Sequence, residues 1–110
     1  MKKQIVSLKD TSEGFVVEEK KGKKIYLVQE KLEANTPQQE KTYIITFNTK
    51  ENLVQLKNAW DHYVTQQQLT IYFVNTHTNE KWHVQPYFHA KITENIHKSL
   101  DVLFASITEQ

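Results

Sequence analysis

The order of the β-favouring and helix-favouring runs is the feature that most constrains what this chain can fold into. Five short runs are rich in β-branched and aromatic residues, and two other runs space their apolar residues three or four apart. In chain order they read strand, strand, strand, helix, strand, strand, helix. Strands that follow one another with so few helices between them are typical of an α+β domain, not of a doubly wound α/β domain.

The five predicted strands form two hairpins with one strand between them. Residues 15–17 and 25–28 flank a charged turn with a single glycine, which predicts the first hairpin. Residues 69–75 and 81–85 flank a polar turn, which predicts the second, and Pro86 ends it. The remaining strand, residues 42–48, follows a polar stretch that contains Pro37 and is expected to be a loop.

Two helices are predicted from single apolar stripes. The first begins after Asn48 or Thr49, either of which is a good N-cap, and ends near residues 66–68. The second opens at Thr93 and runs almost to Gln110. Each stripe has a central residue that is expected to anchor its helix on the sheet, and these residues are Trp60 and Leu103. Between the second hairpin and the last helix, Tyr87 and Phe88 are expected to cover the end of the sheet.

Together these elements predict one α+β domain over residues 1–110. Its sheet is expected to be five-stranded, mixed and mostly antiparallel, in the order β-β-β-α-β-β-α, with both helices packed on one face. Residues 42–48 and 69–75 are connected through the first helix, so they are predicted to lie parallel with a right-handed crossover. Residues 1–12 fit a short strand and a docked arm equally well.

Composition restricts the chemistry of the chain. Arginine and cysteine are absent, whereas lysine occurs 14 times, and the formal net charge is +1. Mechanisms that need a guanidinium fork, a thiolate or a sulfur-ligated metal are therefore excluded. No apolar run approaches the ~20 residues of a membrane helix, and the first residues do not resemble a secretory signal. The sequence predicts a soluble, cytoplasmic protein with no membrane contact.

The spacing of ionisable residues gives no catalytic or metal-binding motif. The histidines His62, His77, His83, His89 and His97 match no ligand spacing, so no metal is predicted. Asp61 and His62 are adjacent on a helix and point apart, which removes the obvious dyad. The two glycines form no phosphate-binding loop, so no cofactor is predicted. An enzyme for a small molecule, with a site built from distant residues, stays open as an alternative.

A cluster of lysines offers a second alternative. Lys20, Lys21, Lys23 and Lys24 surround the glycine of the first predicted hairpin, where a basic β-ribbon could contact the phosphates of a nucleic acid. Two glutamates precede the cluster, and lysines at such a turn are also typical of solvated strand edges. A net charge near neutrality falls short of the footprint of most nucleic-acid-binding domains.

Alternation along the strands indicates an interaction surface. If each strand is regular, one face carries enough apolar residues to pack against both helices. The opposite face should then be polar, but it carries six aromatic or β-branched residues instead. They are Val16, Tyr26, Val28, Ile44, Tyr72 and Val74.

Either strand propensity or the N-terminal segment could account for these six residues. We favour a third interpretation, which is a non-catalytic protein-interaction module. It would associate through this face, most simply with a second copy as a homodimer.

Overall fold

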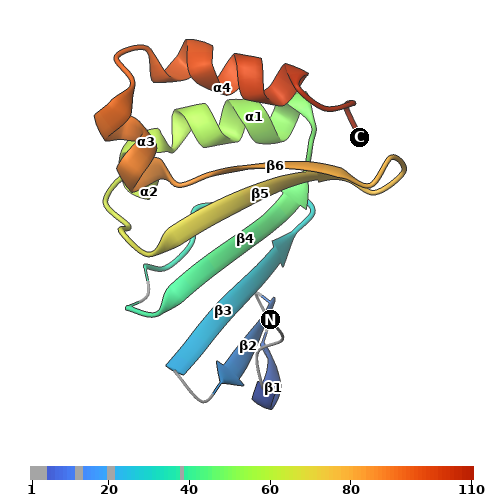
Figure 1. Ribbon diagram of the computed structural model, residues 1–110, viewed down its shortest axis with the longest axis vertical. Helices are drawn as coiled ribbons and strands as arrows, with labels where there is room; N and C mark the ends of the chain where they lie inside the picture. Colours follow the sequence, from blue (N-terminus) through green and yellow to red (C-terminus); the bar gives the residue numbers. More distant parts are fainter. Residues whose placement is uncertain (1–4, 12–13, 20–21, 38) are drawn as a thin grey trace.

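One sheet carries all the strands, and the helices gather on one side of it (Figure 1). The structure is a computed structural model that describes residues 5–11, 14–19, 22–37 and 39–110, and for 5–11, 14–19, 22 and 23 it describes the backbone alone. The α+β class is confirmed. The elements are β1 (Ile5–Thr11), β2 (Gly14–Glu19), β3 (Gly22–Gln29), β4 (Lys41–Phe47), α1 (Lys50–Asn58), α2 (Trp60–Tyr63), β5 (Leu69–Asn75), β6 (Glu80–Val84), α3 (Pro86–Ile92) and α4 (Ile96–Ala105).

The sheet differs from the predicted one in strand number and direction. Its described strands lie in sequence order from β1 to β6. The β1, β2 and β3 strands run antiparallel, β3, β4 and β5 run parallel, and β6 is antiparallel to β5. The four strands from β3 to β6 form a mixed sheet beneath the helices, and the β1–β2 hairpin extends it (Figure 1). The prediction of five strands is therefore wrong, and the β3–β4 parallel pair was not predicted, whereas the mixed sheet and the β4–β5 parallel pair were.

The second parallel pair, β3 with β4, arises because the polar segment between them crosses the sheet. Parallel neighbours need such a crossover, which is usually a helix. Here it is irregular chain that buries Leu32, 3% exposed, on the helix side of the sheet. The Asn52 side chain of α1 holds it, because its Oδ1 accepts from the Leu32 amide at 2.8 Å and its Nδ2 donates to the Glu30 carbonyl at 3.1 Å.

Four helices replace the two that were predicted. The first predicted helix is divided into α1 and α2 at Ala59, and Thr49 caps it by accepting from the Asn52 amide at 3.2 Å. The additional α3 begins at Pro86, a residue favoured in the first turn. The last helix ends at Ala105, short of the predicted end. No helix in the described ranges is long and apolar enough to cross a membrane.

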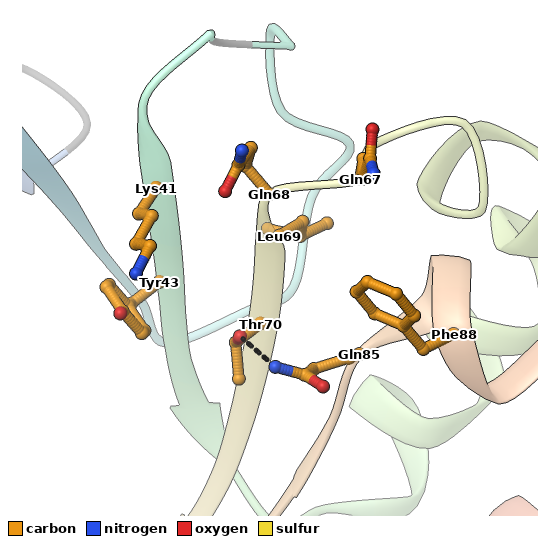
Figure 2. Close-up of a pocket in the computed structure, with 8 residues that line it drawn as sticks. All are labelled: Lys41, Tyr43, Gln67, Gln68, Leu69, Thr70, Gln85 and Phe88. Carbon is orange, nitrogen blue, oxygen red and sulfur yellow. Dashed lines mark hydrogen bonds between the residues drawn. The ribbon is translucent and has the colours of Figure 1, made fainter.

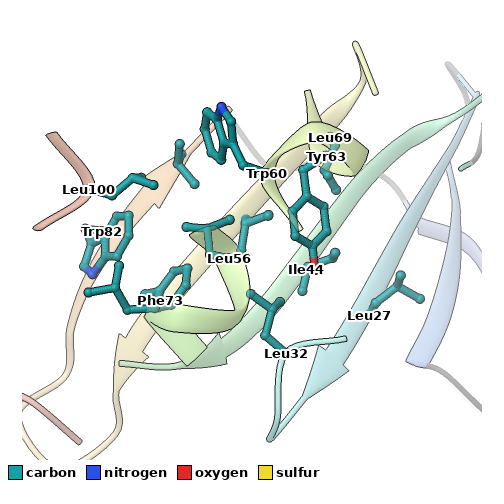
Figure 3. Close-up of a cluster of buried hydrophobic side chains, with 13 residues drawn as sticks. Leu27, Leu32, Ile44, Leu56, Trp60, Tyr63, Leu69, Phe73, Trp82 and Leu100 are labelled. Atoms are coloured by element: carbon teal, nitrogen blue, oxygen red, sulfur yellow. The ribbon is translucent and has the colours of Figure 1, made fainter. Parts of the chain in front are cut away.

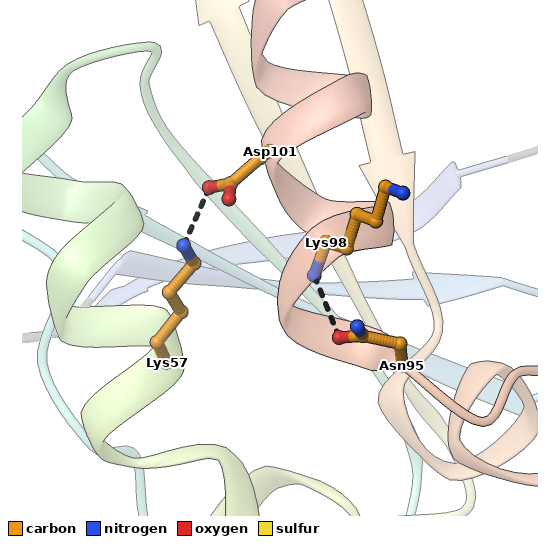
Figure 4. A network of polar contacts seen from close by, with 4 residues as sticks. All are labelled: Lys57, Asn95, Lys98 and Asp101. Atoms are coloured by element: carbon orange, nitrogen blue, oxygen red, sulfur yellow. Dashed lines mark hydrogen bonds and ion pairs between the residues drawn. The ribbon is translucent and has the colours of Figure 1, made fainter.

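The last helix forms one polar contact at its start and another with α1. Asn95 caps α4 by accepting a hydrogen bond from the Lys98 amide at 3.2 Å, and Lys57 of α1 forms an ion pair with Asp101 of α4 (Figure 4). The Asp101 side chain is 57% exposed, so water screens this pair. The ion pair therefore contributes little stability, and the apolar contacts beneath it hold the helices.

The hydrophobic core lies between the helices and strands β3 to β6 (Figure 3). Ile44, Ile71 and Phe73 from the sheet are fully buried there, as are Leu56 and Leu100 from the helices. Trp60 is buried, as predicted. Leu103 is only half-buried, because α4 turns Leu100 toward the sheet in its place.

Two buried asparagines attach the C-terminal residues to the sheet. The Asn48 side chain is fully buried, where its Oδ1 accepts from Trp82 Nε1 at 2.7 Å and its Nδ2 donates to the carbonyls of Phe104 and Thr108. Asn75 donates to the Thr108 carbonyl at 2.9 Å. Because buried amides need such partners, these contacts fix the end of α4 against β4, β5 and β6.

Candidate functional site

The candidate site is the face of strands β3 to β6 that points away from the helices, which we call the open face. Side chains alternate along a strand, and the buried neighbours Leu27, Ile44, Phe73 and Trp82 mark the other face. The strand register aligns the rows across the sheet. The described residues of the open face are Lys24, Tyr26, Val28, Lys41, Tyr43, Ile45, Phe47, Thr70, Tyr72, Val74, Lys81 and His83.

Strand β4 faces the opposite way from the sequence-based prediction. Ile44 was assigned to the open face, but it is fully buried under the helices. Thr42 and Thr46 share its side of the strand, and both are 2% exposed. A buried threonine is tolerated when its hydroxyl is bonded, and the Thr46 hydroxyl accepts from Asn52 Nδ2 at 3.0 Å. Tyr43, Ile45 and Phe47, which hydropathy placed in the core, therefore lie on the open face.

The other predicted interface residues divide into two groups. Tyr26, Val28, Tyr72 and Val74 lie on the open face, and their role in an interface stays a prediction. Val16 pairs with Ile25 in the β2–β3 register, and its side chain lies outside the description.

Of the lysine cluster, Lys20 and Lys21 lie outside the described residues, and Lys23 is described in its backbone only. Lys24 is half-buried, and its Nζ lies 5.8 Å from the centre of the Tyr43 ring. That ring belongs to the open face, so the described member of the cluster is part of the same surface. Binding of nucleic acid by the cluster stays a prediction.

Four rings form a ladder across the open face. The Tyr26 and Tyr43 rings stack at 5.1 Å with 19° between their planes. Tyr43 and Tyr72 follow at 6.4 Å, and Tyr72 and His83 at 5.4 Å. The stacked rings of Tyr26 and Tyr43 therefore occupy one flat surface of each other, the kind of surface on which a nucleobase stacks.

Cationic groups mark both ends of the open face. Lys24 and Lys41 are neighbours in the β3–β4 register, at the end where β4 begins. Lys81 lies toward the other end, with its Nζ 5.9 Å from the Tyr72 ring centre. Among the described residues, no aspartate or glutamate lies on the open face. The surface is thus apolar in its centre and positively charged at its ends.

A pocket of about 250 Å³ adjoins the open face where β4 and β5 begin (Figure 2). Within it, Thr70 is 7% exposed, and its hydroxyl accepts from Gln85 Nε2 at 3.4 Å. Phe88 of α3 forms the far wall and is 45% exposed. The pocket is lined by Lys41, Tyr43, Gln67, Gln68, Leu69, Thr70, Gln85 and Phe88, none of which is a carboxylate or an imidazole.

The sequence did not indicate this pocket, because its walls come from the starts of two strands, the end of a third and a helix that was not predicted. Pro86 stands in the first turn of α3, where proline is favoured. This residue is the sequence signal from which α3 could have been predicted.

Ionisable groups elsewhere do not gather into a second site. No three metal-ligating side chains come together among the described residues. His62 Nε2 lies 2.8 Å from the Asn35 carbonyl, which gives that ring a structural partner. Burial raises the pKa of Tyr63 to about 12, with nearby Glu33 adding to the effect. Hydrogen bonds from Thr78 and Thr108 lower the pKa of Glu80.

Comparison of the chain with protein-family models, curated proteins and solved structures finds no match. No related protein therefore supplies a role for any residue.

Proposed function

We propose that this protein is a non-catalytic binding module that receives an amphipathic helix of another protein on its open face. The observation that supports this proposal is the coverage of the parallel strands. Strands β3, β4 and β5 are parallel, and the described helices lie on one side of them only. All-parallel sheets occur almost only with both faces covered, and within this mixed sheet β4 has a parallel neighbour on each side. The open face is thus a surface that lacks its second layer.

The side chains of the open face agree with a covered surface. Ile45, Phe47 and Val74 form a half-buried apolar centre, and Val28, which is 57% exposed, adjoins it as the register neighbour of Ile45. The same sheet packs α1 and α4 against its other face, so a helix is the element that suits it. Four strands of about seven residues make a face of roughly 19 by 23 Å, and a helix of four turns is about 21 Å long.

A second copy of the chain fits this face less well. Its footprint of roughly 440 Å² is about half of the ~800 Å² that each partner contributes to a stable complex. A symmetric contact would also bring lysines toward lysines, because the described open face carries lysines and no carboxylate. Carboxylates on the flanks of a partner helix would match the cationic ends. Self-association, as predicted from sequence, is therefore the competing outcome of the test.

The other two alternatives have less support in the geometry. The pocket offers no carboxylate, imidazole or thiol for acid-base or nucleophilic chemistry. The Tyr26 and Tyr43 rings stack on each other, which leaves fewer free faces for nucleobases. That the module works in the cytoplasm stays a prediction of the sequence.

The test uses a synthetic helix as the probe. The capped peptide has about 15 residues, with leucines at helical spacing and glutamates on both flanks, and a matched peptide carries lysines in place of the glutamates. Each is titrated into the labelled protein and followed by the shifts of backbone amide resonances. We expect saturable shifts on β3 to β6 with the acidic peptide and much weaker shifts with the basic one.

Two variants with matched exposure sharpen this experiment. Val28→Glu places a charge on β3 beside the apolar centre of the open face, and Val54→Glu places one on the outer surface of α1, where the valine is 53% exposed. Only Val28→Glu should abolish binding of the acidic peptide. Equal binding of both peptides, or binding that survives Val28→Glu, would refute the proposal.

Sedimentation equilibrium at hundreds of micromolar tests the competing occupant. We expect a monomer. A dimer that Val28→Glu dissociates and Val54→Glu does not would show that a second copy covers the face, and would overturn the helix proposal. A single-stranded RNA oligonucleotide is titrated in place of the peptide. Saturable amide shifts on β3 to β6 with this RNA would overturn the helix proposal in favour of nucleic-acid binding.

A further inference from the structure

We infer that the pocket beside Tyr43 is a carboxylate-binding subsite, which takes one acidic side chain of the helix that covers the open face. The inference rests on the proposed function for the source of that side chain. Its chemistry rests on the pocket alone, so the two are tested separately below.

Position connects the pocket to the open face. Tyr43 belongs to both, because its ring stacks on Tyr26 in the ladder and also lines the pocket. Figure 2 shows the Lys41 amine beside the Tyr43 ring, with Gln85 and Phe88 opposite. A helix lying along the face would therefore end above this pocket, and a side chain near that end could enter it.

The lining groups favour an anion that accepts hydrogen bonds. Lys41 is the only charged residue of the lining, and an ammonium group only donates. The amides of Gln67, Gln68 and Gln85 add further N–H donors around the same space. The Thr70 hydroxyl accepts from Gln85, so its own hydrogen is left to donate. A carboxylate has acceptor sites only, and no carboxylate in the lining repels it.

The size and apolar wall of the pocket favour a single side chain over a free ligand. At about 250 Å³ it is smaller than the 300–1,000 Å³ typical of small-molecule sites. Phe88, 45% exposed, offers an apolar surface to the methylene groups of a glutamate. One lysine balances one negative charge, whereas phosphate groups are more often held by several basic groups or by arginine.

Lys41 is exposed at the start of β4. Among the described residues, no carboxylate forms an ion pair with its ammonium group. A carboxylate in the pocket would therefore not have to displace another described acidic group.

The test uses two probes that differ in one group. Capped glutamate, acetylated at its nitrogen and methylamidated at its α-carboxyl, is titrated into the full chain, and capped glutamine serves as its neutral match. Backbone amide shifts at Leu69, Thr70, Gln85 and Phe88 report binding. We expect capped glutamate to bind more tightly than capped glutamine, by up to about fivefold, the upper end of the range for an exposed charge pair.

The lysine variant identifies the group responsible. Lys41→Gln should remove this preference, weakening the binding of capped glutamate by up to about fivefold and leaving the binding of capped glutamine unchanged. Lys50→Gln, which removes an exposed lysine from the start of α1, serves as the matched control and should change neither. Equal affinity for the two probes, or an equal effect of both variants, would overturn the carboxylate subsite.

The two proposals fail in different ways. If capped glutamate binds as expected and the acidic peptide does not bind, the helix proposal falls and the carboxylate site stands. The opposite outcome has two parts. The acidic peptide binds the open face with an affinity that Lys41→Gln leaves unchanged, and capped glutamate shifts none of the pocket resonances. The carboxylate subsite is then refuted and the proposed function stands.

Discussion

The two faces of the β3–β6 sheet are both rich in apolar residues, yet they have opposite surroundings. On the covered face, Ile44, Ile71 and Phe73 are fully buried under helices. On the open face, Val28 is 57% exposed and the tyrosines are half-buried. Polar residues distinguish the faces better than apolar ones, because Thr46 and Asn52 are buried only where their groups find partners. Hydropathy alone therefore misjudges which face of β4 meets the helices.

The sharpest test of this difference uses two adjacent isoleucines of β4. Ile44→Ala empties a fully buried site and should lower the free energy of unfolding by about 2–4 kcal/mol, whereas Ile45→Ala on the open face should cost less than about 1 kcal/mol. Urea denaturation measures both. Equal losses would show that something covers the open face in the isolated protein, and the comparison of the faces would then break down.

The next largest effect concerns the polar contacts of the covered face. Asn48→Ala leaves Trp82 Nε1 and two carbonyls near the C-terminus without their partner. Because unpaired buried polar groups are costly, the variant should lose about 2–3 kcal/mol of stability. Asn58→Ala, at an exposed position near the end of α1, provides the control. A urea midpoint for Asn48→Ala that matched the control would mean that these contacts do not hold the C-terminal residues.

A smaller effect of opposite sign is expected at Tyr63 of the covered face. Its hydroxyl is buried and has no hydrogen-bond partner among the described residues. Removing an unsatisfied buried group should help, so Tyr63→Phe should raise stability by about 1 kcal/mol near neutral pH. Thermal and urea unfolding would both detect the gain. A loss of stability instead would indicate that the hydroxyl has a partner, such as a buried water.

The same variant predicts a dependence on pH. The pKa of Tyr63 is raised to about 12 in the fold, above its ordinary value of 10. Below pH 10 the hydroxyl is neutral in the folded and the unfolded chain, so the free energy of unfolding does not depend on its ionisation. As the pH rises from 10 to 12, the hydroxyl ionises first in the unfolded chain, which lowers the free energy of unfolding by about 2–3 kcal/mol. Tyr63→Phe should escape this loss, so its advantage over the unsubstituted chain should grow in that window. An advantage that stays constant would contradict the raised pKa.

The smallest effect is expected at exposed valines on the two sides of the molecule. Val28→Glu on the open face and Val54→Glu on α1 should each change the free energy of unfolding by less than about 0.5 kcal/mol, because both positions already meet water. Circular dichroism during urea unfolding provides the measurement. A large loss for Val28→Glu alone would indicate that the open face is buried in the protein as it exists in solution.

Local patterns in the sequence were sufficient for several elements. The turn around Gly22 indicated the β2–β3 hairpin, and the bounds of β5 agree with the predicted residues 69–75. The helical spacing after Thr49 was also predicted, and of the two predicted caps, Asn48 and Thr49, the structure uses Thr49. These features depend on neighbours within a few residues, which a sequence displays directly. On the open face, this reasoning found Tyr26, Val28, Tyr72 and Val74.

Other features depend on partners that are distant in the sequence. The crossover before β4 is held by Asn52, which lies about twenty residues beyond Leu32 in the sequence. The residues next to Leu32 give no signal that predicts this contact. The orientation of β4 depends on Thr46 finding the same Asn52, which reversed the assignment of Ile44 and concealed Tyr43 and Ile45. The pocket likewise needs Gln85 and Phe88 to come beside Thr70.

By itself, the sequence determined the α+β class, most of the strands and helices, and the excess of apolar residues on a face without helices. Those follow from local periodicity and turn chemistry. Only the tertiary structure decided which side of β4 faces the helices, how many strands run parallel, and that Lys41 and Phe88 share a pocket. The physical reason is that buried polar groups must find partners, and those partners are chosen by the packing of the whole chain, not by their neighbours in sequence.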